Sequence, residues 1–135
     1  MTLVDTNVLL DLLTDDPVWA GWSLEALDSA LLDGGLLIND VIYAELAGRF
    51  ETIEPLNEFV SGVGLEMASM SPQALFLAAK AFRRYRASGG ARTGALPDFF
   101  IGAQAAASDY ALITRDVARY QTYFPDIRLI SPKLN

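Results

Sequence analysis

Apolar and polar residues alternate in short blocks along the chain, and this pattern predicts alternating strands and helices. Short apolar runs predict strands at residues 3–4, 36–38, 64–68, 111–114 and 128–130. Apolar positions at helical spacing predict helices at residues 8–13, 17–33, 41–50, 72–88 and 97–108 and a short one from Pro55. This order is typical of an α/β fold with a parallel sheet covered on both faces.

Two of these helices carry an apolar face that we expect to enter the core. The predicted core positions are Ala20, Leu24, Leu27 and Leu31 in helix 17–33, and Leu75, Ala79 and Phe82 in helix 72–88. Trp19 and Trp22 are then free to form an apolar patch for a partner protein, and packing into the core is the alternative.

The length of 135 residues and a hydrophobic share of 52% predict a single domain over residues 1–135. The absence of cysteine and histidine excludes disulfides, zinc sites with thiolate or imidazole ligands, and triads with a histidine base. No apolar run reaches the roughly 18 residues that span a bilayer, and the start lacks a basic leader. We therefore expect a soluble cytoplasmic protein without a membrane partner.

The net charge of −7 is unusual for a protein that binds nucleic acid, but the charge is unevenly distributed. Residues 1–66 carry thirteen acids and one base, a balance of −12, whereas residues 67–135 carry nine bases and four acids, a balance of +5. The bases just ahead of Asp98 are Lys80, Arg83, Arg84, Arg86 and Arg92. They can face a phosphate backbone, and a solvated helix face explains them equally well.

Four acids fall where the predicted topology brings the strand ends together. Asp5 and Asp116 come at the ends of predicted strands, so both lie at the carboxyl edge of the sheet. Glu45 lies in the second turn of a helix that starts at this edge. Asp98 heads a helix that must also start there, because the chain then returns through a strand. The topology therefore gathers the four carboxylates at one rim.

Clustered carboxylates with no lysine or arginine among them repel one another, so a cation is needed to hold them together. Oxygen ligands suit Mg²⁺ or Mn²⁺, which keep several waters and bridge to substrate phosphate. Such an ion activates a bound water and stabilises the charge that develops on a phosphodiester. We expect a site for one or two divalent ions. Thr6, Asn7 and Thr114 lie beside the acids and are expected to hold carboxylates or metal waters.

Each of these residues also has a structural explanation. An Asp at a helix start, such as Asp98 or Asp116, is more often a cap than a ligand. Glutamates on exposed helix faces, such as Glu45, are common, and local capping explains the neighbouring threonines and asparagine nearly as well. Asp5 has no evident structural role, and the joint placement of four acids favours a functional site.

Short motifs around these acids resemble those of PIN domains. The segment Leu3-Val4-Asp5-Thr6-Asn7 resembles the start of the family, and Tyr43-Ala44-Glu45-Leu46 resembles its second acid on a short helix. The segment Leu96-Pro97-Asp98 resembles the acid that heads an alanine-rich helix, and Thr114-Arg115-Asp116 resembles the ending of the family's pattern. Two departures, Asn39-Asp40 before the Glu45 helix and the pair Phe99-Phe100, bear on substrate fit and leave the acids intact.

The resemblance implies a three-layer α/β/α fold and a Mg²⁺- or Mn²⁺-dependent endoribonuclease whose catalytic and metal-binding residues are Asp5, Glu45, Asp98 and Asp116. The length resembles that of VapC toxins. The resemblance to these toxins implies an RNA substrate, tRNA or ribosomal RNA. It also implies a homodimer and a hetero-oligomer with a VapB-like antitoxin. We expect RNA contacts from Arg83, Arg84, Arg86, Arg92 and Arg115.

Two alternatives stay open at this point. Haloacid-dehalogenase-like phosphatases also place an Asp after the first strand, but they normally have a second Asp where this chain has Asn7, and a lysine near the last acid. The lysines here are Lys80 and Lys133. A PIN domain that binds a partner without catalysis is expected to lack one of the acids, and this chain keeps all four.

Overall fold

A parallel five-stranded sheet forms the centre of the molecule, which a computed structural model describes over residues 1–132. The strands are β1 Thr2–Val4, β2 Leu36–Ile38, β3 Leu65–Met67, β4 Ala111–Ile113 and β5 Leu129–Ile130. Their order in the sheet is β3-β2-β1-β4-β5, and every neighbouring pair is parallel. The predicted α/β fold with a parallel sheet is confirmed.

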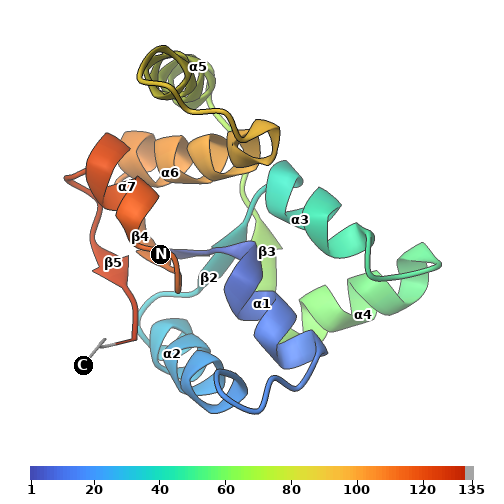
Figure 1. The fold of residues 1–135 in the computed structure, drawn as a ribbon. Helices are drawn as coiled ribbons and strands as arrows, with labels where there is room; N and C mark the ends of the chain where they lie inside the picture. Colours follow the sequence, from blue (N-terminus) through green and yellow to red (C-terminus); the bar gives the residue numbers. More distant parts are fainter. Residues whose placement is uncertain (133–135) are drawn as a thin grey trace.

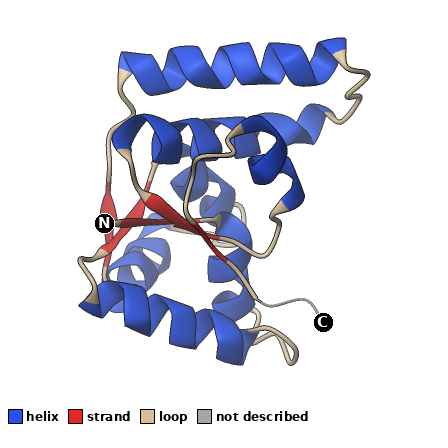
Figure 2. Cartoon of the chain, turned by 90° about the vertical axis from the view of Figure 1, so that its left-hand side faces the viewer, coloured by secondary structure: helices blue, strands red, loops and turns tan. Residues whose placement is uncertain are grey.

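Helices cover both faces of this sheet. They are α1 Thr6–Leu13, α2 Ala20–Leu32, α3 Asp40–Ala47, α4 Ile53–Val63, α5 Pro72–Ala87, α6 Leu96–Ser108 and α7 Ala118–Tyr123, with a short 3-10 turn, η1 Thr93–Ala95, before α6. Figure 1 shows α1, α2 and α4 below the sheet and α6 above it, with α5 packed outside α6. The view in Figure 2 shows the sheet between these helical layers.

The central strands are apolar on both faces because helices cover both. Leu3, Val4, Ile38, Leu112 and Ile113 are fully buried. The edge strand β3 differs, since Glu66 and Met67 are exposed and only Leu65 is buried. The exposed positions explain why the sequence pattern of β3 is weak.

The buried face of α2 differs from the predicted one. Leu27 enters the core, but Leu24 is 50% exposed and Leu31 is 44% exposed. Ser23 and Ala30 are buried in their place. The rotation has a physical reason, because the hydroxyl of Ser23 donates a hydrogen bond of 2.8 Å to the buried carboxylate of Asp11. A buried carboxylate needs such a donor, so the hydrogen bond to Asp11 stabilises the fold more than the burial of one more leucine would.

The start of α2 and its two tryptophans also correct the sequence analysis. The helix begins at Ala20 because the carboxylate of Asp16 accepts from the backbone N–H groups of Val18 and Trp19 and holds a turn there. Trp22 packs partly against the core. The ring of Trp19 lies 5.0 Å from the guanidinium of Arg115. The two tryptophans therefore do not form a free apolar patch.

The inner face of α5 is made of small residues. Ala74, Ala78 and Ala81 are fully buried, whereas Leu75, predicted for the core, is 44% exposed, and Ala79 is exposed as well. The predicted contact of Phe82 with the core is confirmed. Alanine side chains let α5 pack closely against the alanine-rich α6, and this close packing turns the larger side chains outward.

Candidate active site

Residues from three strands meet at the carboxyl edge of the sheet. Asp5 follows β1, Asn39 follows β2 and Thr114 follows β4. The backbone N–H of Asp5 donates to the carbonyl of Ile113 at 2.9 Å, so β1 and β4 end level with each other. Figure 1 shows that α3 and the starts of α1 and α6 lie at this same end. This edge therefore brings polar side chains from distant parts of the chain together.

Asp5 is the buried acid of this edge, with 4% of its surface exposed. Its Oδ2 accepts hydrogen bonds from the hydroxyls of Thr114 at 2.7 Å and Tyr120 at 2.9 Å and from the amide of Asn7 at 3.4 Å. Burial raises the pKa of Asp5 to about 6, the charge of Asp98 adds to the rise, and the bonds from the two hydroxyls oppose it. The structure thus holds a carboxylate at a place where its charge is costly without a cation.

The segment after β4 is tied to the start of α1. The hydroxyl of Thr114 accepts from the backbone N–H of Asp116 at 3.0 Å. The side-chain oxygen of Asn7 accepts from the backbone N–H of Arg115 at 3.3 Å. These bonds fix the turn that carries Asp116, whose own side chain is exposed.

Glu45 comes from α3 and is held by α1. The hydroxyl of Thr6 donates to its Oε1 at 2.6 Å. The side chain of Glu45 is largely exposed, yet partial burial of the carboxyl raises its pKa, and the nearby charge of Asp98 adds to the rise. The predicted cap at the start of α3 is confirmed, because Asn39 accepts from the backbone N–H of Ile42 at 2.9 Å.

Asp98 stands at the start of α6 and pairs with an arginine that the sequence analysis missed. The guanidinium of Arg119, on α7, donates from Nη1 to its Oδ2. Partial burial raises the pKa of Asp98, the charges of Arg119 and Arg92 oppose the rise, and the charge of Asp116 adds to it. The expectation of acids with no arginine among them was therefore wrong. The electrostatic effects on its pKa also show that Asp98 is near both arginines and Asp116.

Three of the acids share one arrangement. Side-chain donors hold Oδ2 of Asp5, Oε1 of Glu45 and Oδ2 of Asp98, and within residues 1–92 and 94–132 no side chain donates to the other oxygen of any of them. One oxygen of each is fixed in place and the other is available to a ligand. Over this part of the chain, no three acids stand close enough to form a ready metal cage. Binding a hard cation would therefore draw the acids closer together.

A comparison with models of protein families identifies the family of this chain. The model of the PIN domain matches residues 2–124. The chain belongs to the PIN-domain family. No curated protein sequence matches it.

Solved structures share the fold of this PIN domain at low sequence identity. A chain of VapBC2 from Rickettsia felis, bound to promoter DNA, is 17% identical, with a TM-score of 0.71 over 96% of this chain and 97% of that one. A toxin–antitoxin complex from Klebsiella pneumoniae gives 18% identity and a TM-score of 0.71 over 98% of both chains. FitAcB from Neisseria gonorrhoeae gives 21% and 0.67 over 97% of both. At this identity the likeness shows the fold alone.

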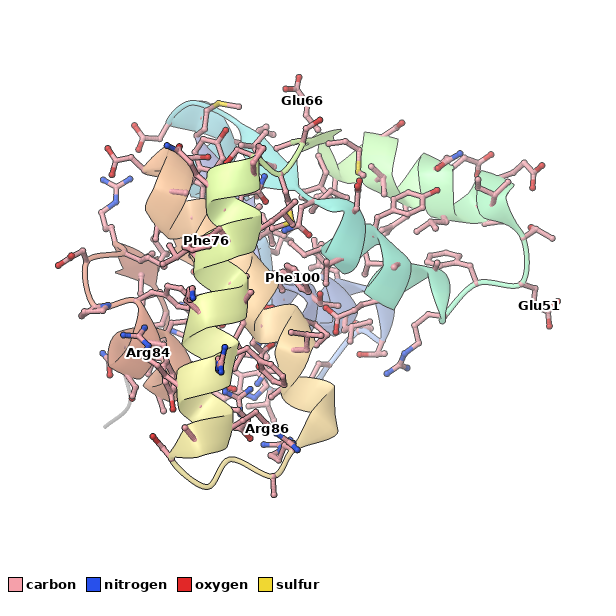
Figure 3. The ribbon with its side chains drawn as sticks, turned by 90° about the horizontal axis from the view of Figure 1, so that it is seen from above. Glu51, Glu66, Phe76, Arg84, Arg86 and Phe100 are labelled. Atoms are coloured by element: carbon pink, nitrogen blue, oxygen red, sulfur yellow. The ribbon has the colours of Figure 1, made fainter. Side chains whose placement is uncertain are left out.

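The five arginines predicted to contact RNA fall into two groups. Arg83, Arg84 and Arg86 are exposed on α5, and Figure 3 shows Arg84 and Arg86 toward the end of that helix, with Phe76 toward its start. Arg92 is exposed in the loop that leads to η1. Arg115 belongs elsewhere. Its Nε and Nη2 donate to both carboxylate oxygens of Asp11, at 2.8 and 2.9 Å.

Tyr120 and Arg119 are the site residues that the sequence analysis missed. They follow Asp116 by four and three positions and lie in α7, which begins at Ala118; in the sequence, this spacing is typical of side chains that share one face of a helix. This spacing was the only local signal for them, and it is common in any helix. The two phenylalanines after Asp98 lie in different environments. Phe99 is fully buried, whereas Phe100 lines an apolar groove of about 360 Å³ that reaches Glu45.

Proposed function

We propose that this PIN domain is a metal-dependent endoribonuclease and the toxin of a type II toxin–antitoxin pair. The observation that carries the proposal is the arrangement of three acids with one oxygen fixed and one available, at the carboxyl edge of a parallel sheet. Oxygen donors in such a set fit Mg²⁺ or Mn²⁺. Membership in the PIN-domain family supports the nuclease class.

The residues divide the work between holding the cation and orienting its ligands. Asp5, Glu45, Asp98 and Asp116 would hold the ion, which when bound supplies an activated water and neutralises charge on the phosphodiester. Thr114, Tyr120 and Asn7 orient Asp5 from three sides. Thr6 orients Glu45, and Arg119 orients Asp98.

The substrate class in this proposal is RNA. Arg83, Arg84, Arg86 and Arg92 supply exposed positive charge in the part of the chain just ahead of Asp98, which suits a phosphate backbone. Arg115 forms a salt bridge with Asp11, so its role in this proposal is to stabilise the fold. Transfer RNA and ribosomal RNA, expected from the resemblance, stay the predicted targets, and the homodimer and the cytoplasmic location also stay predictions.

A partner protein of the VapB kind belongs to the same proposal. The solved relatives include complexes named VapBC, FitAB and toxin–antitoxin. This chain offers an apolar groove of about 210 Å³ between α1, α2 and α4, away from the acids. Leu12, Leu24, Leu31 and Val63 line it, and Leu24 and Leu31 remain exposed. An amphipathic helix of an antitoxin would cover these leucines.

The alternative enzyme class is less well supported by the geometry. A haloacid-dehalogenase-like phosphatase normally uses a second Asp two residues after the first. Here that position is Asn7, whose amide donates to Asp5 and whose oxygen accepts from the backbone of Arg115. Asn7 therefore orients the acid and the turn after β4, and it has no carboxyl with which to move a proton.

The experiment that tests the nuclease compares the wild-type chain with Asp5→Asn after induction in a bacterium that lacks the partner. New RNA 5′ ends are mapped across all cellular transcripts. We expect discrete new ends for the wild type and none for the variant, because the amide cannot serve as an anionic metal ligand. Identical maps from two folded proteins would argue against ribonuclease activity. Glu58→Gln, an exposed acid on α4, is the matched control and should cleave as the wild type does.

A further inference from the structure

Arg119 places a guanidinium beside Asp98, one of the four acids. Its Nη1 donates to Asp98, and 15% of its side chain is exposed. Its guanidinium lies 5.2 Å from the ring centre of Tyr85 and 5.7 Å from that of Phe99. An arginine between a carboxylate and two aromatic rings is held in one orientation and keeps its full charge.

The two rings that hold Arg119 are themselves fixed. Phe99 is fully buried in the core. Tyr85 packs so closely on Gly90 that a Cβ there would lie 2.5 Å from the ring. The hydroxyl of Tyr85 also accepts from the backbone N–H of Arg92 at 3.2 Å. The orientation of the guanidinium is therefore set by packing before any ligand arrives.

The remaining donors of Arg119 reach solvent. Within residues 1–92 and 94–132, neither Nε nor Nη2 of this side chain donates a hydrogen bond. In the same residues no buried side-chain nitrogen or oxygen lacks a partner, so these two nitrogens are not buried. Arg119 thus holds Asp98 with one nitrogen and offers two others beside the acids.

We propose that Arg119 is a catalytic residue that binds an RNA phosphate with Nε and Nη2 while Nη1 holds Asp98. The proposal rests on the nuclease function proposed above. A phosphate that approaches four carboxylates needs positive charge besides the metal, and a planar fork of donors matches its oxygens. The other arginine in the turn after β4, Arg115, has its Nε–Nη2 edge on Asp11 and so cannot offer that edge to a phosphate.

The test measures how RNA affinity depends on salt. The probe is a short fluorescein-labelled oligouridine, bound in Ca²⁺ instead of Mg²⁺, with the dissociation constant taken from anisotropy at several salt concentrations. Each lost phosphate contact lowers the slope of log affinity against log salt by about 0.7 for a single strand. We expect this decrease for Arg119→Gln. The matched control is Arg128→Gln, which removes the same charge just before β5, at the opposite edge of the sheet, and should keep the wild-type slope.

Further variants separate phosphate binding from other roles. Arg119→Lys keeps the charge without the fork and should bind the probe more weakly than wild type with a nearly unchanged slope. Urea unfolding of Arg119→Gln checks that the variant is folded. A wild-type slope in Arg119→Gln, with tighter Mn²⁺ binding by calorimetry, would show a counter-ion for Asp98 only and overturn the proposal.

The outcomes also distinguish this proposal from the nuclease itself. Wild-type protein that binds the probe, together with an unchanged slope in Arg119→Gln, overturns only the role of Arg119. Wild-type protein that binds no probe, and that creates no new RNA ends in cells, overturns both. A lowered slope in Arg119→Gln and an unchanged one in Arg128→Gln support the phosphate contact.

Discussion

Asp5 carries a charge that burial makes costly. Its pKa of about 6 in the folded protein lies above the ordinary value near 4, so at neutral pH its ionisation favours the unfolded chain. Asp5→Asn removes this charge and keeps the shape of the side chain. We expect the metal-free variant to be more stable than wild type by about 1 to 3 kcal/mol at pH 7. Urea unfolding in EDTA measures this, and a less stable variant would contradict the cost assigned to the charge.

The same residue predicts how metal affinity depends on pH. A carboxyl must lose its proton before it binds a cation. With a pKa of about 6 for Asp5, the ionised fraction rises from about one tenth at pH 5 to about nine tenths at pH 7. Mn²⁺ affinity should therefore increase about tenfold over this range, as calorimetry in matched buffers would show. Equal affinities at the two pH values would mean that Asp5 is not a ligand.

At the scale of elements, the contact between α6 and α7 positions Tyr120 on Asp5. Gly102 of α6 allows it, because a Cβ there would lie 2.5 Å from the ring of Phe124 and 3.1 Å from that of Tyr120. We expect Gly102→Ala to lower the free energy of unfolding by about 1 to 3 kcal/mol through overpacking. The substitution should also slow RNA cleavage, since the hydroxyl of Tyr120 would move away from the carboxylate of Asp5.

Gly62 of α4 is the control for this substitution. It is also inside a helix, but no atom lies within 4 Å of a Cβ built there. Gly62→Ala should raise stability by up to about 1 kcal/mol through helix propensity and leave cleavage unchanged. Thermal unfolding of both variants measures the difference. Equal effects at the two glycines would show that the α6–α7 contact is not tight.

A second contact between elements joins α1, α2 and the turn after β4. Asp11, 3% exposed, accepts from the hydroxyl of Ser23 and from Nε and Nη2 of Arg115. Asp11→Ala leaves a hydroxyl and a guanidinium without their partner. We expect a loss of about 3 kcal/mol in chemical denaturation, because breaking one side of a buried pair is costly. Glu58→Ala, on an exposed face of α4, should change stability by less than about 0.5 kcal/mol. A small loss of unfolding free energy in Asp11→Ala would show that the ion pair of Asp11 and Arg115 contributes little to stability.

At the scale of the whole molecule, the acids and the groove between α2 and α4 are separate surfaces. The proposed functions of these surfaces should therefore separate by mutation. Leu24→Glu places a charge in the groove and should weaken binding of the co-expressed antitoxin at least tenfold, about 1.4 kcal/mol, while cleavage stays normal. Cells would then no longer be rescued by the antitoxin. Phe76→Glu, on the exposed side of α5, is the control and should leave rescue intact. Rescue of Leu24→Glu would place the antitoxin on another surface.

Local pattern predicted the element order well and the helix orientations poorly. The apolar runs of β1, β2 and β4 identified the central strands because both faces of these strands are buried. The inner faces of α2 and α5 were misassigned because leucines drew the prediction, whereas the structure buries Ser23 for its bond to Asp11, and the alanines of α5 for close helix packing. A hydrophobic pattern shows how much apolar surface a helix has. Which side of the helix is buried depends on the elements that pack against it.

The α/β order and the location of Asp5, Glu45, Asp98 and Asp116 at the end of a parallel sheet follow from the amino-acid sequence, because strand ends and helix starts are local features and the connections between strands share one handedness. Which charges pair depends on the packed structure. Arg119 pairs with Asp98, 21 positions away, and Arg115 with Asp11, 104 positions away. Such pairs depend on the rotation and closeness of packed helices, which no local pattern contains.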